Sequence, residues 1–189
     1  TEVIAETRQA LSGLNNLEYG VKEFNLNELY PDHNNLFFMT DEKWRNPWAA
    51  GAQLSHYIFF CYHSNKYKYI VAILEKLKKY EKRNGWYHGN PKPKQLINGL
   101  MKIFTGLDII GITVEPPMAK NIIDYLIGNS GTRGGCSIYD YVYVMIRCLE
   151  STAGTHKKAE CERILLMLTM QILEHQMPDG GFKYDETTE

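Results

Sequence analysis

The sequence predicts an all-α fold built from helical hairpins repeated along the chain. Apolar residues recur at three- and four-residue steps in most segments between residues 46 and 176, which is the spacing of one helix face. Three glycine turns interrupt this pattern at Asn84-Gly85-Trp86, Gly134-Gly135-Cys136 and Asp179-Gly180-Gly181-Phe182. The glycines at 85, 135 and 181 are 50 and 46 residues apart, and one helix–turn–helix unit takes about 35–50 residues. Because one hairpin cannot bury its apolar face alone, we expect neighbouring hairpins to stack around a shared core.

The first part of the chain predicts one short helix and then an irregular segment. Residues 1–14 place apolar side chains at helical spacing among polar neighbours, as in a short amphipathic helix. Residues 15–46 are rich in Asn, Asp and Pro and predict only a turn or two of helix, with an apolar run at Leu36-Phe37-Phe38-Met39. We therefore expect a single domain over residues 1–189, in which residues 1–45 precede three helical pairs in residues 46–185.

The first helical pair has clear start and stop signals. Asn46 is a good N-cap and Pro47 suits the first helical position, so a helix is predicted to about residue 64. Its partner covers about residues 66–83, is amphipathic with a charged face, and is predicted to end in a C-terminal cap at Asn84-Gly85.

The second and third pairs follow the same scheme. A helix begins at Pro93, and its partner begins at Glu115-Pro116 and closes near residue 128. Ser137 caps a helix to about residue 150, and a last helix over residues 156–176 stops before Pro178. Residues 139–146 also fit a strand, but both of its faces would be apolar and its neighbours are helices, so we predict a helix there.

In each pair an apolar helix precedes a more polar one, which predicts a curved layer with the apolar helices inside. At its glycine turns the chain resembles the α/α-toroid superfamily of terpene cyclases and protein prenyltransferases. The residues that carry the resemblance are Gln176-Met177-Pro178-Asp179-Gly180-Gly181-Phe182, similar to the Q-x-x-D-G-G-F/W turn of those proteins, and the other two turns are weaker copies. Three pairs are fewer than a full ring contains, so we expect either an incomplete toroid or a fragment of something longer.

The resemblance extends to the fold and not to the chemistry. The chain has no D-x-D-D acid motif, which triterpene cyclases use to protonate a polyene. It also lacks a D-x-C sequence followed by a downstream histidine, which protein prenyltransferases use to hold zinc. No cofactor or metal is therefore expected.

Composition excludes a general affinity for polyanions. The chain has 44% hydrophobic residues and a net charge of −1 from 21 basic and 22 acidic residues, so neither nucleic acid nor an acidic membrane is an expected partner. The four cysteines show no C-x-x-C spacing, which predicts buried thiols in a reducing compartment. No apolar run approaches membrane-spanning length and no signal peptide opens the chain, so we expect a cytoplasmic protein, although a start at Thr1 is compatible with a missing leader or upstream domain.

One group of polar residues recurs at equal intervals on the predicted inner helices. His56, Asn98 and Asp140 are 42 residues apart, and seven residues further His63, Thr105 and Arg147 repeat the interval. Apolar and aromatic residues lie between these two layers: Phe59, Met101 and Tyr143. If the helices face one cavity, polar groups from three elements converge within an apolar wall, as in a small-molecule pocket.

These residue types would suit acid–base chemistry. His56 or Tyr143 could exchange a proton, Asp140 could orient the imidazole, Arg147 could hold a carboxylate and Asn98 could donate to an oxyanion. Such a set is similar to that of α/α-barrel polysaccharide lyases. The simpler interpretation is that they are hydrogen-bonded core or helix-end residues, with His56 an ordinary core histidine.

A second candidate is the aromatic loop that begins at Trp86. Its rings could stack on a sugar or peptide, or could plug one end of the helical layer, and the plug is the favoured interpretation. Three function classes remain open. The first, which we prefer, is a domain that binds a small molecule, glycan or peptide on its inner face. The others are an enzyme acting on carbohydrate or terpenoid substrates and a protein-interaction scaffold that forms an oligomer.

Overall fold

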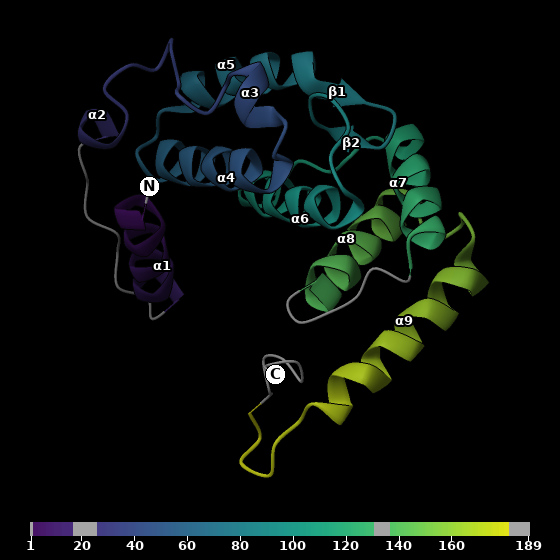
Figure 1. The fold of residues 1–189 in the computed structure, drawn as a ribbon. Helices are drawn as coiled ribbons and strands as arrows, with labels where there is room; N and C mark the ends of the chain where they lie inside the picture. Colours follow the sequence, from purple (N-terminus) through teal and green to yellow (C-terminus); the bar gives the residue numbers. More distant parts are fainter. Residues whose placement is uncertain (1, 17–25, 131–136, 182–189) are drawn as a thin grey trace.

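The computed structural model describes residues 2–16, 26–130 and 137–181. In these ranges the fold is helical with one small hairpin, which confirms the all-α class (Figure 1). The elements are α1 (Glu2–Asn16), α2 (Leu26–Leu29), α3 (Asp41–Trp44), α4 (Pro47–His63), α5 (Tyr67–Leu77), a 3-10 turn (Lys78–Tyr80), β1 (Glu81–Lys82), β2 (Gly85–Trp86), α6 (Pro93–Ile109), α7 (Pro116–Gly128), α8 (Ser137–Ser151) and α9 (Lys158–Glu174).

The helices α4, α6 and α8 form a row, and the other elements surround it. α6 lies between α4 and α8 and packs against both (Figure 1). α5 packs on α4, α7 and α9 pack on α8, and α1 packs on α4 near the start of the chain. The three predicted inner helices are therefore neighbours.

Local signals set the starts of α4, α6 and α7 as predicted. The side-chain oxygen of Asn46 accepts a hydrogen bond from the backbone N–H of Ala49 at 3.4 Å, and Pro47 occupies the first turn of α4. Prolines also open α6 and α7, where the first backbone N–H groups have no partner within the helix. The predicted cap at Ser137 is wrong, because Ser137 is the first residue of α8 and its buried hydroxyl has no hydrogen-bond partner among the described residues. Residues 139–146 are helical, as predicted, and lie within α8.

Glycines let α4 and α6 approach closely. A Cβ atom placed on Gly99 would lie 2.7 Å from the carbonyl carbon of Pro47, and one on Gly51 would lie 2.9 Å from the carbonyl oxygen of Gly99. A Cβ atom placed on Gly106 would likewise lie 3.0 Å from Cα of Ser55. The backbones of the two helices are therefore in contact, which fixes the geometry of everything that lies between them.

The predicted helix over residues 66–83 is wrong at its C-terminal end. α5 ends at Leu77, and Asn84-Gly85 belongs to an antiparallel hairpin in which Lys82 pairs with Gly85 instead of forming a helix cap. Gly85 has φ of +139°, and a Cβ there would lie 2.8 Å from a methyl group of Leu100, so this position requires glycine.

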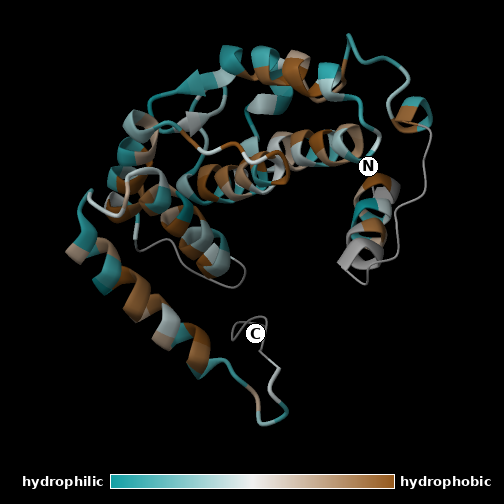
Figure 2. Cartoon of the chain, turned by 180° about the vertical axis from the view of Figure 1, so that it is seen from behind, coloured by the Kyte–Doolittle hydropathy of each residue, from teal (hydrophilic) through white to brown (hydrophobic). Residues whose placement is uncertain are grey.

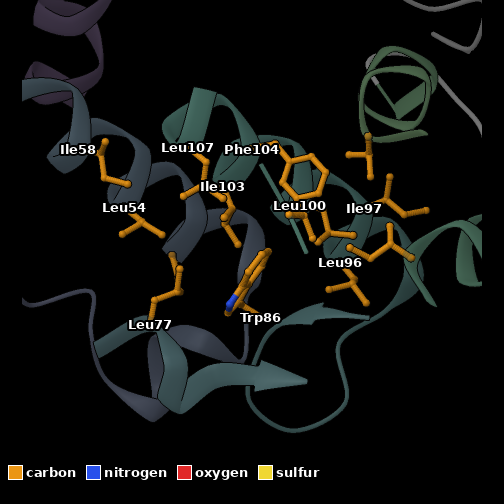
Figure 3. Packing of buried hydrophobic residues seen from close by; sticks show 14 of the residues in the cluster. Leu54, Ile58, Leu77, Trp86, Leu96, Ile97, Leu100, Ile103, Phe104 and Leu107 are labelled. Carbon is orange, nitrogen blue, oxygen red and sulfur yellow. The ribbon is translucent and has the colours of Figure 1, made fainter. Parts of the chain in front are cut away.

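The hairpin carries Trp86 into the core. The indole is buried, is directed at α6 and meets the ring of Phe104 edge-on at 6.5 Å (Figure 3). Trp86 is therefore a core residue that packs against α6. Directly before the hairpin in the chain, Tyr80 stacks on Trp44 of α3 with 4.7 Å between the ring centres, and both rings are buried.

The last helix, α9, carries hydrophobic residues along its length (Figure 2), and one row of them is exposed. Its buried side, formed by Cys161, Ile164 and Leu168, faces the rest of the fold. A second set of large apolar side chains at the same helical spacing is exposed: Leu166, Met170, Leu173 and, just beyond the helix, Met177. The glycine turn at residues 134–136 and Phe182 lie outside the described residues.

Candidate functional site

A cavity of about 900 Å³ lies between α1, α3, α4, α6 and the segment before α3. Small side chains on the first two turns of α4 help to create this space, because Ala49, Ala50 and Ala52 all line it. Aromatic rings stand at its edge, where Trp48 is 50% exposed and Phe37 is 47% exposed. The lining residues are Ala5, Arg8, Gln9, Phe37, Phe38, Lys43, Trp48, Ala49, Ala50, Ala52, Gln53, His56, Met101, Lys102 and Thr105.

Polar groups from three helices meet along one wall of this cavity. Arg8 of α1 donates from Nη1 to Ser55 Oγ at 2.8 Å and lies 3.3 Å from His56 Nδ1. Ser55 Oγ is in turn 3.2 Å from Thr105 Oγ1 of α6. The guanidinium also lies over the ring of Phe59, 5.6 Å from its centre. These contacts attach α1 to the row of helices.

The protonation state of His56 follows from its surroundings. Burial lowers the pKa of His56 to about 4, and the positive charges of Arg8 and Lys102 act in the same direction. The imidazole is therefore neutral at pH 7. Because a guanidinium can only donate, Nδ1 of His56 accepts, and the ring proton is on Nε2. His56 thus offers one N–H donor and carries no charge.

The electrostatic character of the cavity is basic. Arg8, Lys43 and Lys102 contribute three cations from three different helices, and the lining residues that the structure describes include no carboxylate. Gln53 adds an amide whose Oε1 is buried and has no hydrogen-bond partner within the described ranges. The wall can therefore supply positive charge and hydrogen bonds to a bound molecule.

Asn98 and Asp140 meet each other at the interface of α6 and α8. With the amide oriented to satisfy both of its ends, Asn98 Nδ2 donates to Asp140 Oδ2 at 3.0 Å and to the Lys94 carbonyl oxygen at 3.0 Å. Asp140 is only 6% exposed, and burial raises the pKa of its carboxyl to about 6, against the opposing charges of Lys102 and Lys94. Neither residue lines the cavity that contains His56.

Tyr143 and Arg147 form a separate cluster around Asp108 of α6. The hydroxyl of Tyr143 donates to one oxygen of Asp108, and Arg147 pairs with the other. Arg147 also donates to Glu150 at 2.5 Å. Because both side chains already hold an internal carboxylate, this cluster has the character of a structural ion pair that joins α6 to α8.

The remaining predicted residues have packing roles. Phe59 is buried beneath Arg8, and the ring of His63 lies 4.3 Å from that of Phe59 at the end of α4. Burial lowers the pKa of His63 below its usual value. Of the eight site residues predicted from the sequence, only His56 lines the cavity, together with Met101 and Thr105 of the same pattern.

Sequence reasoning missed Arg8, Lys43 and Lys102. The sequence does contain one signal for Arg8. Arg8 lies four residues after Ile4 and three before Leu11, so it is on the same face of α1 as these apolar residues. A cation inside an apolar stripe is unusual enough to mark a functional position. Lys43 and Lys102 have no comparable signal.

No family model, curated protein or solved structure matches this chain. In the described ranges, no group of three or more His, Cys, Asp or Glu side chains is arranged to hold a metal ion. No described helix combines the length and the apolar character that crossing a bilayer requires.

Proposed function

We propose that this chain binds a small organic molecule in the cavity between α1, α4 and α6. The observation that supports this most directly is the cavity itself. Its volume of about 900 Å³ falls in the range of ligand pockets, roughly 300–1,000 Å³, and its wall combines aromatic and aliphatic surface with a few convergent polar groups. We also propose that the row formed by α4, α6 and α8 is the inner layer of an incomplete α/α toroid.

The proposal predicts that probes of suitable shape bind and that filling the cavity prevents it. We would titrate 1-naphthoate, 1-naphthylmethanol and 1-naphthylmethylammonium by ligand-detected NMR. At about 0.3 kcal/mol for each of about a dozen heavy atoms, Kd values near 1 mM are expected for the best probe. Ala52→Trp, which places an indole in the cavity, should weaken binding at least tenfold.

The matched control is Ala72→Trp, because Ala72 is exposed on α5 and does not line the cavity. Circular dichroism would establish that both variants are folded, with Ala49→Trp as a second way to fill the cavity. The proposal fails if none of the three probes binds the wild type, or if a folded cavity-filled variant binds as well as the Ala72→Trp control.

The enzyme alternative receives less support from the geometry. It relied on His56 and Asp140 acting together, yet Nδ1 of His56 faces Arg8 and Asp140 is bonded to Asn98. No hydrogen bond joins His56 to Asp140 among the contacts of the described residues.

The scaffold alternative is favoured by the exposed row on α9. Leu166, Met170 and Leu173 of α9 are spaced by four and three residues, which is the seam spacing of paired helices, and exposed Met177 lies just beyond the helix. Arg163 at one end and Glu174 at the other are also exposed, so an antiparallel pair would bring opposite charges close together. The occupant that fits is α9 of a second copy.

This second candidate predicts a dimer of the 21.9 kDa chain that dissociates when the row becomes polar. Light scattering at about 100 µM should give twice the monomer mass for the wild type, and Leu166→Glu with Leu173→Glu should give the monomer. A monomeric wild type at that concentration would rule the candidate out. Val71→Glu, which replaces an exposed apolar residue of α5 outside the row, serves as the control.

A further inference from the structure

We infer that the ligand of the α1/α4/α6 cavity is an amphipathic anion: a flat or aliphatic apolar body that carries a carboxylate or phosphate group held by Arg8 and Lys102. This inference rests on the proposed function and specifies the chemical class of the ligand. It goes beyond the presence of a cavity, because a pocket of the same size could equally well suit a neutral or a cationic molecule.

The first argument is the environment of Arg8. Its guanidinium is half-buried, and its partners are a serine hydroxyl, a neutral imidazole and an aromatic face, all without charge. Burial lowers the pKa of Arg8 from its usual value. A cation withdrawn from water usually has an anionic partner, since its desolvation is otherwise uncompensated. None of the contacts of Arg8 in the described part of the chain is a carboxylate, and an anionic ligand would supply one.

The second argument is the sum of charges along the wall. Lys102 of α6 lines the cavity and is half-buried. Its positive charge helps to lower the pKa of His56 on one side, and on the other side it opposes the burial that raises the pKa of Asp140. Lys43 adds a third cation from α3. Three like charges around one space repel each other, and that repulsion is relieved when an anion enters between them.

The third argument is the division of the wall into polar and apolar parts. Arg8, His56 and Thr105 belong to the polar part, where neutral His56 can donate from Nε2 to an anion without being protonated. Trp48, Phe37 and Met101 supply aromatic and thioether surface to the same space. A molecule with an acidic head and an apolar body matches both parts.

The experiment compares probes that share a naphthalene body and differ in their head. We expect 1-naphthoate or 1-naphthyl phosphate to bind the wild type at least tenfold more tightly than 1-naphthylmethanol, and 1-naphthylmethylammonium to bind most weakly. The ratio between the two anions assigns the carboxylate or the phosphate. Raising the salt concentration should weaken the anions and leave the alcohol unchanged.

Variants then assign the head to its binding residues. Arg8→Gln and Lys102→Gln should each weaken the preferred anion about tenfold and leave the alcohol within twofold, and Arg8→Lys should retain part of the affinity. Arg163→Gln, an exposed cation of α9 outside the cavity, is the matched control. Since Arg8→Gln removes contacts of α1, Lys102→Gln provides an independent readout that leaves those contacts in place.

The outcomes separate the two proposals. If no probe binds the wild type, the proposed function fails. If the alcohol binds as tightly as both anions and Ala52→Trp blocks all of them, the cavity binds ligands but the anion inference is overturned. The inference is also overturned if the anion is preferred and neither Arg8→Gln nor Lys102→Gln changes its affinity.

Discussion

Replacing Gly99 with alanine should lower the free energy of unfolding by roughly 1–3 kcal/mol, because the new methyl group has no space. It would lie 2.7 Å from the carbonyl carbon and 2.8 Å from Cβ of Pro47, both well inside van der Waals contact. These atoms belong to the first turn of α4 and cannot rotate away as a flexible side chain could. Relief therefore requires α4 and α6 to move apart. Chemical denaturation at pH 7 measures the loss.

Gly128→Ala is the matched control for this prediction. Gly128 is the last residue of α7, and a Cβ there would meet nothing within 4 Å. Since alanine favours the helix by up to about 1 kcal/mol, this variant should be neutral or slightly stabilised. Equal stabilities of the Gly99→Ala and Gly128→Ala proteins would show that the two helices are not in backbone contact. Because α4 and α6 both line the cavity, Gly99→Ala should also weaken probe binding.

Helix starts were predictable because the signals that set them are local. Asn46-Pro47, Pro93 and Pro116 act within one turn of the backbone that they cap, and the structure begins α4, α6 and α7 there. The end of α5 was not predictable in the same way. Its charged sequence continues a helical pattern to Arg83, but the hairpin is held by Tyr87 N–H donating to the Tyr80 carbonyl oxygen at 2.9 Å and by burial of Trp86 on α6. Those are tertiary interactions, which override local propensity.

In the candidate site too, local sequence signals were predictable and tertiary contacts were not. His56 was identifiable because a polar residue on an apolar helix is conspicuous, and equal spacing correctly suggested that Asn98 lies near Asp140. Spacing could not show that α6 separates α4 from α8, so that equivalent positions on these two helices meet different neighbours. The role of Arg8 depends on where α1 docks, which a periodic pattern in the inner helices does not contain.

Asp140→Asn should raise the free energy of unfolding at pH 7 by about 2–3 kcal/mol, at 1.36 kcal/mol per pKa unit. The pKa of the Asp140 carboxyl rises from 3.8 to about 6 in the folded chain, chiefly through burial, and Lys102 and Lys94 oppose the shift. The folded state therefore binds the proton more tightly than the unfolded state. Stability conferred by this group is present below pH 3.8 and is lost as the pH rises through 6. Its place in the first turn of α8 recovers only about 0.3–1 kcal/mol, so desolvation prevails.

His56→Gln should produce the opposite pH dependence. Burial, with the charges of Arg8 on α1 and Lys102 on α6, lowers the pKa of His56 from 6.5 to about 4, so the folded state resists protonation. The stability associated with neutral His56 is complete above pH 6.5 and declines as the pH falls toward 4. Glutamine keeps an acceptor for Arg8 and cannot be protonated, so the variant should gain stability relative to the wild type only at low pH.

The two groups therefore offset each other in the wild type between pH 4 and 6, and each variant exposes the other group. In Asp140→Asn the free energy of unfolding should fall more steeply than in the wild type as the pH drops from 6.5 to 4. In His56→Gln it should fall less steeply, or rise. Urea denaturation at four pH values measures both slopes, and NMR measures the pKa of His56. Each slope is taken as the difference from the wild type, so that the contributions of carboxylates common to all three proteins cancel. A difference between Asp140→Asn and wild type that does not change between pH 3.5 and 7 would mean that Asp140 titrates normally and is not held in a desolvated site between α6 and α8.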